Sequence, residues 1–253
     1  MVDSARAERV PNDTTGPPAD AGRLAPTARC CYPRRMASTG PVERELKFSL
    51  VDPPPPPATV VALGRRGPYA FVEAGTTVHR DRYFDGGAGQ LRRAGWALRQ
   101  RRVLPGDGGE PPAVLATLKG AGRVDGAMHE REEIEAPMAG RAWPAEVARR
   151  VATHVAPAEL RPLLSLETER AAYRVTFEGR PVAALAFDRV RVRIPGGERS
   201  AHFDEVEIEA LGAETEDVLR GIVDLLDGLV RLTPSSASKL ERADALLALG
   251  ASL

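Results

Sequence analysis

Apolar and polar residues alternate along much of the chain from residue 42 to residue 210, a pattern typical of antiparallel strands whose two faces differ. Gly- and Pro-containing segments interrupt the alternation and predict turns, for example at 86–87, 106–109 and 195–197. The predicted strands cover residues 42–48, 96–103, 114–119, 129–136, 163–170, 172–177, 182–194 and 202–210.

Helical spacing predicts a smaller set of helices, over residues 58–63, 145–155, 214–231 and 239–249. The strongest is 214–231, where the apolar residues form one stripe. We find no internal repeat. Residues 41–250 are therefore expected to form one α+β domain dominated by antiparallel strands.

Residues 1–40 lack any such period and are rich in Pro, Ala, Arg, Asp and Thr, so we expect a disordered N-terminal extension. Met36 is a candidate start of translation. Cys30 and Cys31 are the only cysteines and both lie in this extension, which excludes a stabilising disulfide or a Cys-based zinc site in the domain.

The 253 residues carry 35 Lys plus Arg and 35 Asp plus Glu, a net charge of zero. Such a balance argues against long-range attraction to nucleic acid or to an anionic membrane. The sequence has no apolar run of membrane-spanning length, and its first residues lack the apolar stretch of a secretory signal. We expect a cytoplasmic protein with neither nucleic acid nor membrane as its partner.

Charged side chains recur at every second position on several predicted strands. One charged face on a strand is usually just a solvated face. Here, however, neighbouring carboxylates share a face and repel one another unless a cation lies between them. The sets are Glu43, Glu45 and Lys47; Arg99 and Arg101; Arg131, Glu133 and Glu135; and Glu205, Glu207 and Glu209.

Paired carboxylates are natural ligands for a hard divalent cation such as Mg²⁺ or Mn²⁺. The Arg and Lys positions suit phosphate oxygens. If the antiparallel sheet closes around these faces, it forms a tunnel lined with charge, the reverse of the usual apolar barrel interior.

The motifs resemble those of the CYTH superfamily, the triphosphate tunnel metalloenzymes. Residues 42–48, VERELKF, resemble the family's ExExK signature. Further motifs follow in the family's order: Tyr83-Phe84-Asp85 (YFD), 97–101 (LRxR), 117–119 ((T/E)xK), 131–135 (RxExE), Glu169-Arg170, Asp188, Glu205-Val206-Glu207 and Ser238-Lys239. All three lysines of the chain fall on motif positions, which argues against a chance match.

The resemblance implies an eight-stranded antiparallel β-barrel, the triphosphate tunnel, with flanking helices. It implies phosphate contacts by Lys47, Arg99, Arg101, Lys119, Arg131, Arg170 and Lys239. It implies that one or two divalent metals, Mg²⁺ or Mn²⁺, are held by Glu43, Glu45, Glu133, Asp188, Glu205 and Glu207.

Glu43, Glu45 and Lys47 are the catalytic residues that we expect from this resemblance. Tyr83 and Phe84 are expected to pack rather than to bind. The four histidines lie off the motif positions and are expected to be non-catalytic: His79, His129, His154 and His202.

The family acts on several triphosphates, and the sequence favours one without an organic part. The cyclase branch tends to carry His-Phe shortly before ExExK, where this chain has residues 38–41, STGP. The thiamine branch tends to place an aromatic residue where this chain has Ala97, and Trp96 is expected to face the other side.

We therefore expect a triphosphatase that hydrolyses inorganic tripolyphosphate, as a monomer or homodimer. An adenylyl cyclase, a thiamine triphosphatase and a non-catalytic polyphosphate- or nucleotide-binding module remain alternatives.

Overall fold

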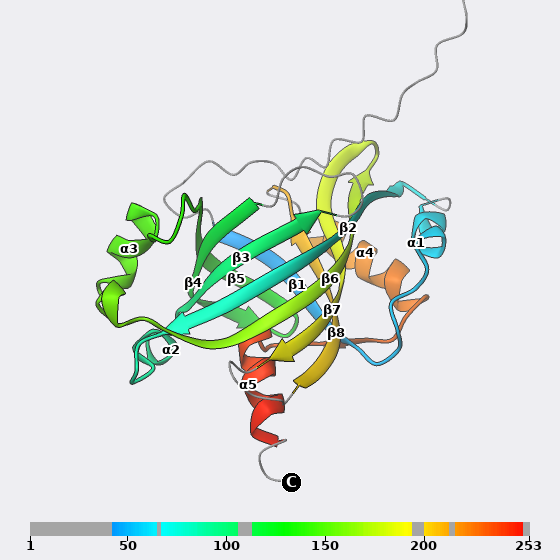
Figure 1. Ribbon diagram of the computed structural model, residues 1–253. Helices are drawn as coiled ribbons and strands as arrows, with labels where there is room; N and C mark the ends of the chain where they lie inside the picture. The colour runs from blue at the N-terminus through cyan, green and yellow to red at the C-terminus, as the bar shows by residue number, and fades with distance from the viewer. Residues whose placement is uncertain (1–41, 65–66, 106–112, 194–199, 213–215, 250–253) are drawn as a thin grey trace, which may run out of the picture.

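One nine-stranded sheet forms the body of the computed structural model, which describes residues 42–64, 67–105, 113–193, 200–212 and 216–249 (Figure 1). The strands are β1 (Val42–Leu50), β2 (Tyr69–Asp85), β3 (Ala97–Pro105), β4 (Ala113–Asp125), β5 (Met128–Pro137), β6 (Arg161–Phe177), β7 (Arg180–Arg193), β8 (Ser200–Ala210) and β9 (Leu232–Pro234). The helices are α1 (Pro57–Leu63), α2 (Gln90–Arg93), α3 (Ala145–Val151), α4 (Glu216–Asp227) and α5 (Lys239–Leu249), with a 3-10 turn η1 at Pro157–Glu159.

The sheet closes on itself as an antiparallel barrel. Its strand order is β5-β4-β3-β2-β6-β7-β8-β1-β9, and a further pairing of β5 with β1 joins the two ends. The short β9 adds to β1 outside the closed eight-stranded ring. The predicted α+β fold, an eight-stranded antiparallel barrel with flanking helices, is confirmed.

The barrel carries its charges inside and much of its apolar surface outside. On β1, Glu43, Glu45 and Lys47 are buried on the inner face, whereas Phe48 faces outward into a hydrophobic core. That outer core is formed by β1, β2, β6, β7 and β8 with α1 and α4, and includes Ile222 of α4. The helices therefore supply the apolar burial that the charged interior does not.

A second outer core lies over β3, β4 and β5, where α3 packs Val147 and Val151 against Leu118 and Ile134 (Figure 1). The part of β2, β6 and β7 that lies away from the first outer core has a polar outer face, with ion pairs such as Arg80–Glu167. Charged residues at alternate positions of a strand therefore point inward where an apolar core covers the outer face, and outward where the outer face is polar.

A third apolar cluster lies at the end of the barrel next to α5 (Figure 1). Leu166, Val192 and Phe203 of the strands pack there against Leu240 and Ala243 of α5. The helix therefore packs against this end of the barrel and brings its first residues close to the charged interior.

Most predicted strands are confirmed, but the segment before Tyr83 is a correction. The sequence pattern predicts no element over residues 69–82, although they belong to the 17-residue strand β2. Its outward residues are largely polar and its inward residues include His79 and Asp81, so apolar alternation does not reveal it. The predicted strands 163–170 and 172–177 are one continuous strand, β6.

Smaller differences concern the helices. The helix predicted over 145–155 ends at Val151, and neither α2 nor β9 was predicted. The predicted turns at 106–109 and 195–197, the start of the 214–231 helix and the whole 1–40 extension with its cysteines lie outside the described residues. Within the described part of the chain, no helix is both long and apolar enough to cross a membrane.

Candidate functional site

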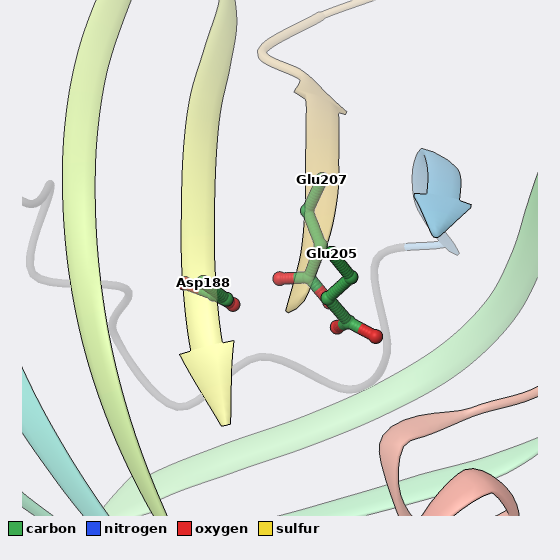
Figure 2. A group of neighbouring side chains, drawn as sticks. All are labelled: Asp188, Glu205 and Glu207. Carbon is green, nitrogen blue, oxygen red and sulfur yellow. The ribbon is translucent and has the colours of Figure 1, made fainter. Parts of the chain in front are cut away.

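Three carboxylates from neighbouring strands meet in the barrel interior (Figure 2). Asp188 of β7 lies opposite Glu205 of β8 in the sheet register, and Glu207 follows on the same face of β8. One carboxylate oxygen from each lies within 4.8 Å of the others, and all three residues are buried. We call this set the acidic cluster.

The ammonium group of Lys239 contacts every member of the acidic cluster. Its Nζ lies 2.9 Å from Asp188 and 2.6 Å from Glu207, and it also pairs with Glu205. Lys239 is only 4% exposed and opens α5, whose first turn is fixed by reciprocal hydrogen bonds between Ser238 and Glu241. Burial opposes the charge, but the three carboxylates outweigh it and raise the pKa of Lys239 above its usual value.

Arg170 of β6 borders the same cluster. Its Nε donates to Asp188 at 2.7 Å, and its guanidinium also pairs with Glu207. Burial alone would raise the pKa of Glu207, but Lys239, Lys47 and Arg170 hold it well below its usual value. Asp188 and Glu207 are therefore ionised and paired with cations of the protein itself.

A second charged group lies where β1 meets β4 and β5. Lys119 donates to the two carboxylate oxygens of Glu43 at 2.8 and 2.9 Å and lies 3.6 Å from Glu133. Arg131 is 3.3 Å from Glu43 and also pairs with Glu45. Strand pairing of Glu43 with Arg131 and of Lys119 with Glu133 places these side chains on one face.

Lys47 connects the two groups. Its Nζ lies 3.3 Å from Glu45, two residues earlier on β1, and 2.9 Å from Glu207 of the acidic cluster. Burial would lower the pKa of Lys47, yet Glu207 and Glu45 outweigh this effect and raise it. The three residues expected to be catalytic, Glu43, Glu45 and Lys47, thus lie inside the barrel in one connected network.

Asp81 pairs with the cations in a third part of the interior, and it lies outside the motifs that predicted the site residues. Its carboxylate accepts hydrogen bonds from Nε and an NH2 group of Arg101, both at 2.7 Å, and lies 3.5 Å from Arg99. Burial opposes its charge, but Arg101 and Arg99 hold the pKa of Asp81 well below its usual value. A signal was present, since Asp81 lies two positions before Tyr83 on the same strand face.

All residues predicted to bind phosphate or metal line the barrel interior, but they are not one cluster. Of the six proposed metal ligands, Glu43, Glu45 and Glu133 belong with Lys119 and Arg131 and not with the acidic cluster. A further cation was missed: Arg242, one helical turn after Lys239, donates to Glu205 at 3.0 Å.

The aromatic residues of the motifs have packing roles, as predicted. Tyr83 is buried in the apolar cluster beside α5, and Phe84 makes an edge-on contact with Trp143. Asp85 completes this motif by accepting the backbone N–H groups of Gly86 and Leu91, at 2.7 and 2.8 Å, next to α2. Trp96 packs into the second outer core, over β3, β4 and β5, and Arg150 stacks over its ring.

Comparison with known proteins places this chain in a family. The model of the CYTH domain matches residues 43–243. No curated protein matches the chain.

Solved structures share the fold. A Hippeastrum protein described as a candidate adenylyl cyclase with a dominant triphosphatase activity has a TM-score of 0.56 and 21% identity, over 80% of this chain and 95% of that one. A Bacillus halodurans protein described as a candidate adenylate cyclase has a TM-score of 0.50 and 19% identity, over 79% and 96% of the two chains. At these identities the likeness concerns the fold.

Proposed function

Because the chain belongs to the CYTH domain family, we propose that it is a metal-dependent triphosphatase that hydrolyses inorganic tripolyphosphate inside its barrel. The observation that carries the proposal is the buried interior in which Lys and Arg alternate with carboxylates. Phosphoryl transfer asks a protein mainly for positioning and charge neutralisation, and both can come from such a lining.

The acidic cluster fits a divalent cation of the hard type. Its three ligands are carboxylates from adjacent strands, with oxygens close enough to share one ion, and carboxylate oxygen is what Mg²⁺ and Mn²⁺ prefer. Asp188, Glu205 and Glu207 would hold this ion, and the predicted ligands Glu43, Glu45 and Glu133 offer a second set. When bound, the ion neutralises charge on phosphate oxygens and activates water.

The protein's own groups supply the rest of the chemistry. In this proposal a carboxylate of Glu43 or Glu45 orients the attacking water and Lys47 neutralises charge on the terminal phosphoryl group. Each Lys or Arg described above already has a carboxylate partner. Binding of the triphosphate would therefore replace these ion pairs by contacts to phosphate oxygens. The proposed phosphate contacts are Lys47, Arg99, Arg101, Lys119, Arg131, Arg170 and Lys239.

The nature of the lining favours a substrate made only of phosphate. Tyr83 and Phe203, the aromatic residues on the inner face of the described strands, are packed in the apolar cluster beside α5. Ala97 occupies the position before the LRxR motif, and Trp96 packs on the outside of the barrel. Stacking on a thiamine ring or a base thus has no evident partner among the described inner-face residues.

An adenylyl cyclase is the second candidate, because the similar Bacillus halodurans structure is described in those terms.

Product analysis separates the triphosphatase from the adenylyl cyclase. The full chain is incubated with Mg²⁺ or Mn²⁺ and, in separate reactions, tripolyphosphate, thiamine triphosphate or ATP. We expect orthophosphate released fastest from tripolyphosphate; cyclic AMP and pyrophosphate from ATP would replace the proposal by the cyclase.

Lys239 gives a prediction about metal affinity. Its ammonium lies against all three carboxylates that would hold the ion, so a divalent cation must compete with it. We expect Lys239→Met to bind Mn²⁺ about tenfold more tightly without substrate, as measured by calorimetry or by electron paramagnetic resonance.

Arg242→Met is the matched control, since it removes the same charge one turn later but from a residue that pairs with Glu205 alone in the acidic cluster. An equal gain in both variants would show a general charge effect and contradict direct competition by Lys239.

A further inference from the structure

His79 lies inside the barrel, although its sequence context gave no reason to place it in the site. It belongs to β2, opposite Thr168 of β6, and is 3% exposed. Its neighbours on the inner face of β2 are Thr77 and Asp81, both buried. On β6, the neighbours of Thr168 on the same face are Arg170 in one direction and Leu166, a member of the apolar cluster, in the other. His79 and Thr168 therefore lie beside Asp81 and Arg170 of the charged interior, and Asp81 separates His79 from Tyr83 of the apolar cluster along β2.

Two polar atoms of this pair have no hydrogen-bond partner within the described protein. His79 Nε2 lies 3.1 Å from Thr77 Oγ1, but His79 Nδ1 is buried without a partner. Thr168 Oγ1 is likewise buried without one, in a residue that is 0% exposed. Buried polar groups are rarely left unpaired, so two in adjacent positions indicate that a ligand or an ordered water meets them.

The electrostatic surroundings indicate which ligand suits the pair. Burial, and then the charges of Arg101 and Arg170, lower the pKa of His79 to about 2, so its ring is neutral at ordinary pH. If the Thr77 hydroxyl donates to Nε2, the neutral ring carries its proton on Nδ1. His79 and Thr168 then offer two uncharged donors beside guanidinium groups, a combination that suits an anionic oxygen.

We propose that His79 Nδ1 and Thr168 Oγ1 form a neutral subsite that donates hydrogen bonds to a phosphate oxygen of the bound triphosphate. The subsite lies beside Asp81 and Arg170, and Leu166 of the apolar cluster follows Thr168 on the same face of β6. It rests on the proposed function, because it needs a polyphosphate in the barrel. Because these donors are neutral, they add hydrogen bonds to the phosphate. They do not add positive charge that the carboxylates would have to balance before the ligand binds.

Paired substitutions test the subsite in the full chain. His79→Asn keeps an amide near the position of Nδ1, whereas His79→Gln keeps one near Nε2 and removes the Nδ1 donor. Thr168→Ser keeps the hydroxyl and Thr168→Val removes it with little change of shape. We expect His79→Gln and Thr168→Val each to lower kcat/KM for tripolyphosphate about tenfold or more, and His79→Asn and Thr168→Ser to retain most of it.

A readout independent of turnover covers the case in which a variant fails to fold. The ¹⁵N signals of the His79 ring are followed in the wild-type protein as tripolyphosphate is added in the presence of EDTA. We expect a shift of the Nδ1–H signal on binding, and inorganic phosphate at the same concentration to give a smaller one.

The outcomes separate this proposal from the broader one. If wild-type protein neither binds nor hydrolyses tripolyphosphate, the proposed function fails first. The subsite is refuted if the wild-type protein does bind or hydrolyse tripolyphosphate, but the ¹⁵N signal of His79 Nδ1 does not shift and the two variants at each position have equal kcat/KM. In that case an ordered water meets these two atoms.

Discussion

Replacing Glu207 by Gln is expected to lower kcat for tripolyphosphate by at least about a hundredfold. Glu207 belongs to the acidic cluster and also accepts from Lys47 at 2.9 Å and from Lys239 at 2.6 Å. The variant therefore loses a metal ligand and at the same time leaves two buried ammonium groups short of one counter-charge. Initial rates with Mg²⁺ or Mn²⁺, measured over a range of metal concentrations, give the effect on kcat and on metal dependence together.

Glu167→Gln is the matched control, because Glu167 pairs with Arg80 and Arg191 on the outer face of the barrel. We expect this variant to keep near wild-type rates, since exposed ion pairs contribute little. Equal and small losses in Glu167→Gln and Glu207→Gln would contradict a catalytic interior.

Asp81→Asn is expected to be the most destabilising single substitution in the interior, by about 3–5 kcal/mol in the free energy of unfolding. Asp81 is 2% exposed and is the carboxylate that holds Arg101 and lies near Arg99. An amide in its place leaves both guanidinium groups buried without that counter-charge. Urea unfolding monitored by circular dichroism measures the loss, and Arg80→Gln on the outer face of β2 provides the control, expected within about 0.5 kcal/mol of wild type.

The same residue predicts a pH dependence. The pKa of Asp81 is lower in the folded protein than in the unfolded chain, because Arg101 and Arg99 stabilise its charge against the cost of burial. Its contribution is therefore fully present above the unfolded pKa, about 4, and is lost as the pH falls toward the folded pKa. Unfolding free energies measured between pH 6 and pH 3 are expected to fall less steeply in Asp81→Asn than in wild type; parallel curves would refute this assignment.

The alternation of charges is what made the interior predictable. Glu43, Glu45 and Lys47 repeat every second residue, and only a strand places such a set on one face. Because Leu46 and Phe48 alternate with them, the sequence also indicated that the opposite face is apolar, and that face packs in an outer core. The barrel and the inward placement of the predicted charges followed from this pattern together with the order of the motifs.

The pairing of those charges could not be predicted in the same way. Lys239 opens a C-terminal helix, and nothing in its local sequence indicates that it contacts Asp188, Glu205 and Glu207. That contact depends on closure of the barrel and on the apolar packing that seats α5 at one end.

Asp81 and His79 were missed for another reason. They lie on β2, where polar residues occupy both faces, so hydrophobic periodicity gave no strand on which to place them. Their roles depend on residues of β3 and β6, which are distant in sequence and adjacent only in the sheet.

The central claim is that water attacks a triphosphate bound in the barrel interior, and hydrolysis in ¹⁸O-labelled water tests it most directly. The full chain is incubated with tripolyphosphate and Mg²⁺ or Mn²⁺, and the products are analysed by mass spectrometry. We predict orthophosphate that carries one ¹⁸O atom and unlabelled pyrophosphate, as in-line attack on the terminal phosphorus requires. Absence of labelled orthophosphate with either metal, from protein shown to be folded, would contradict the account.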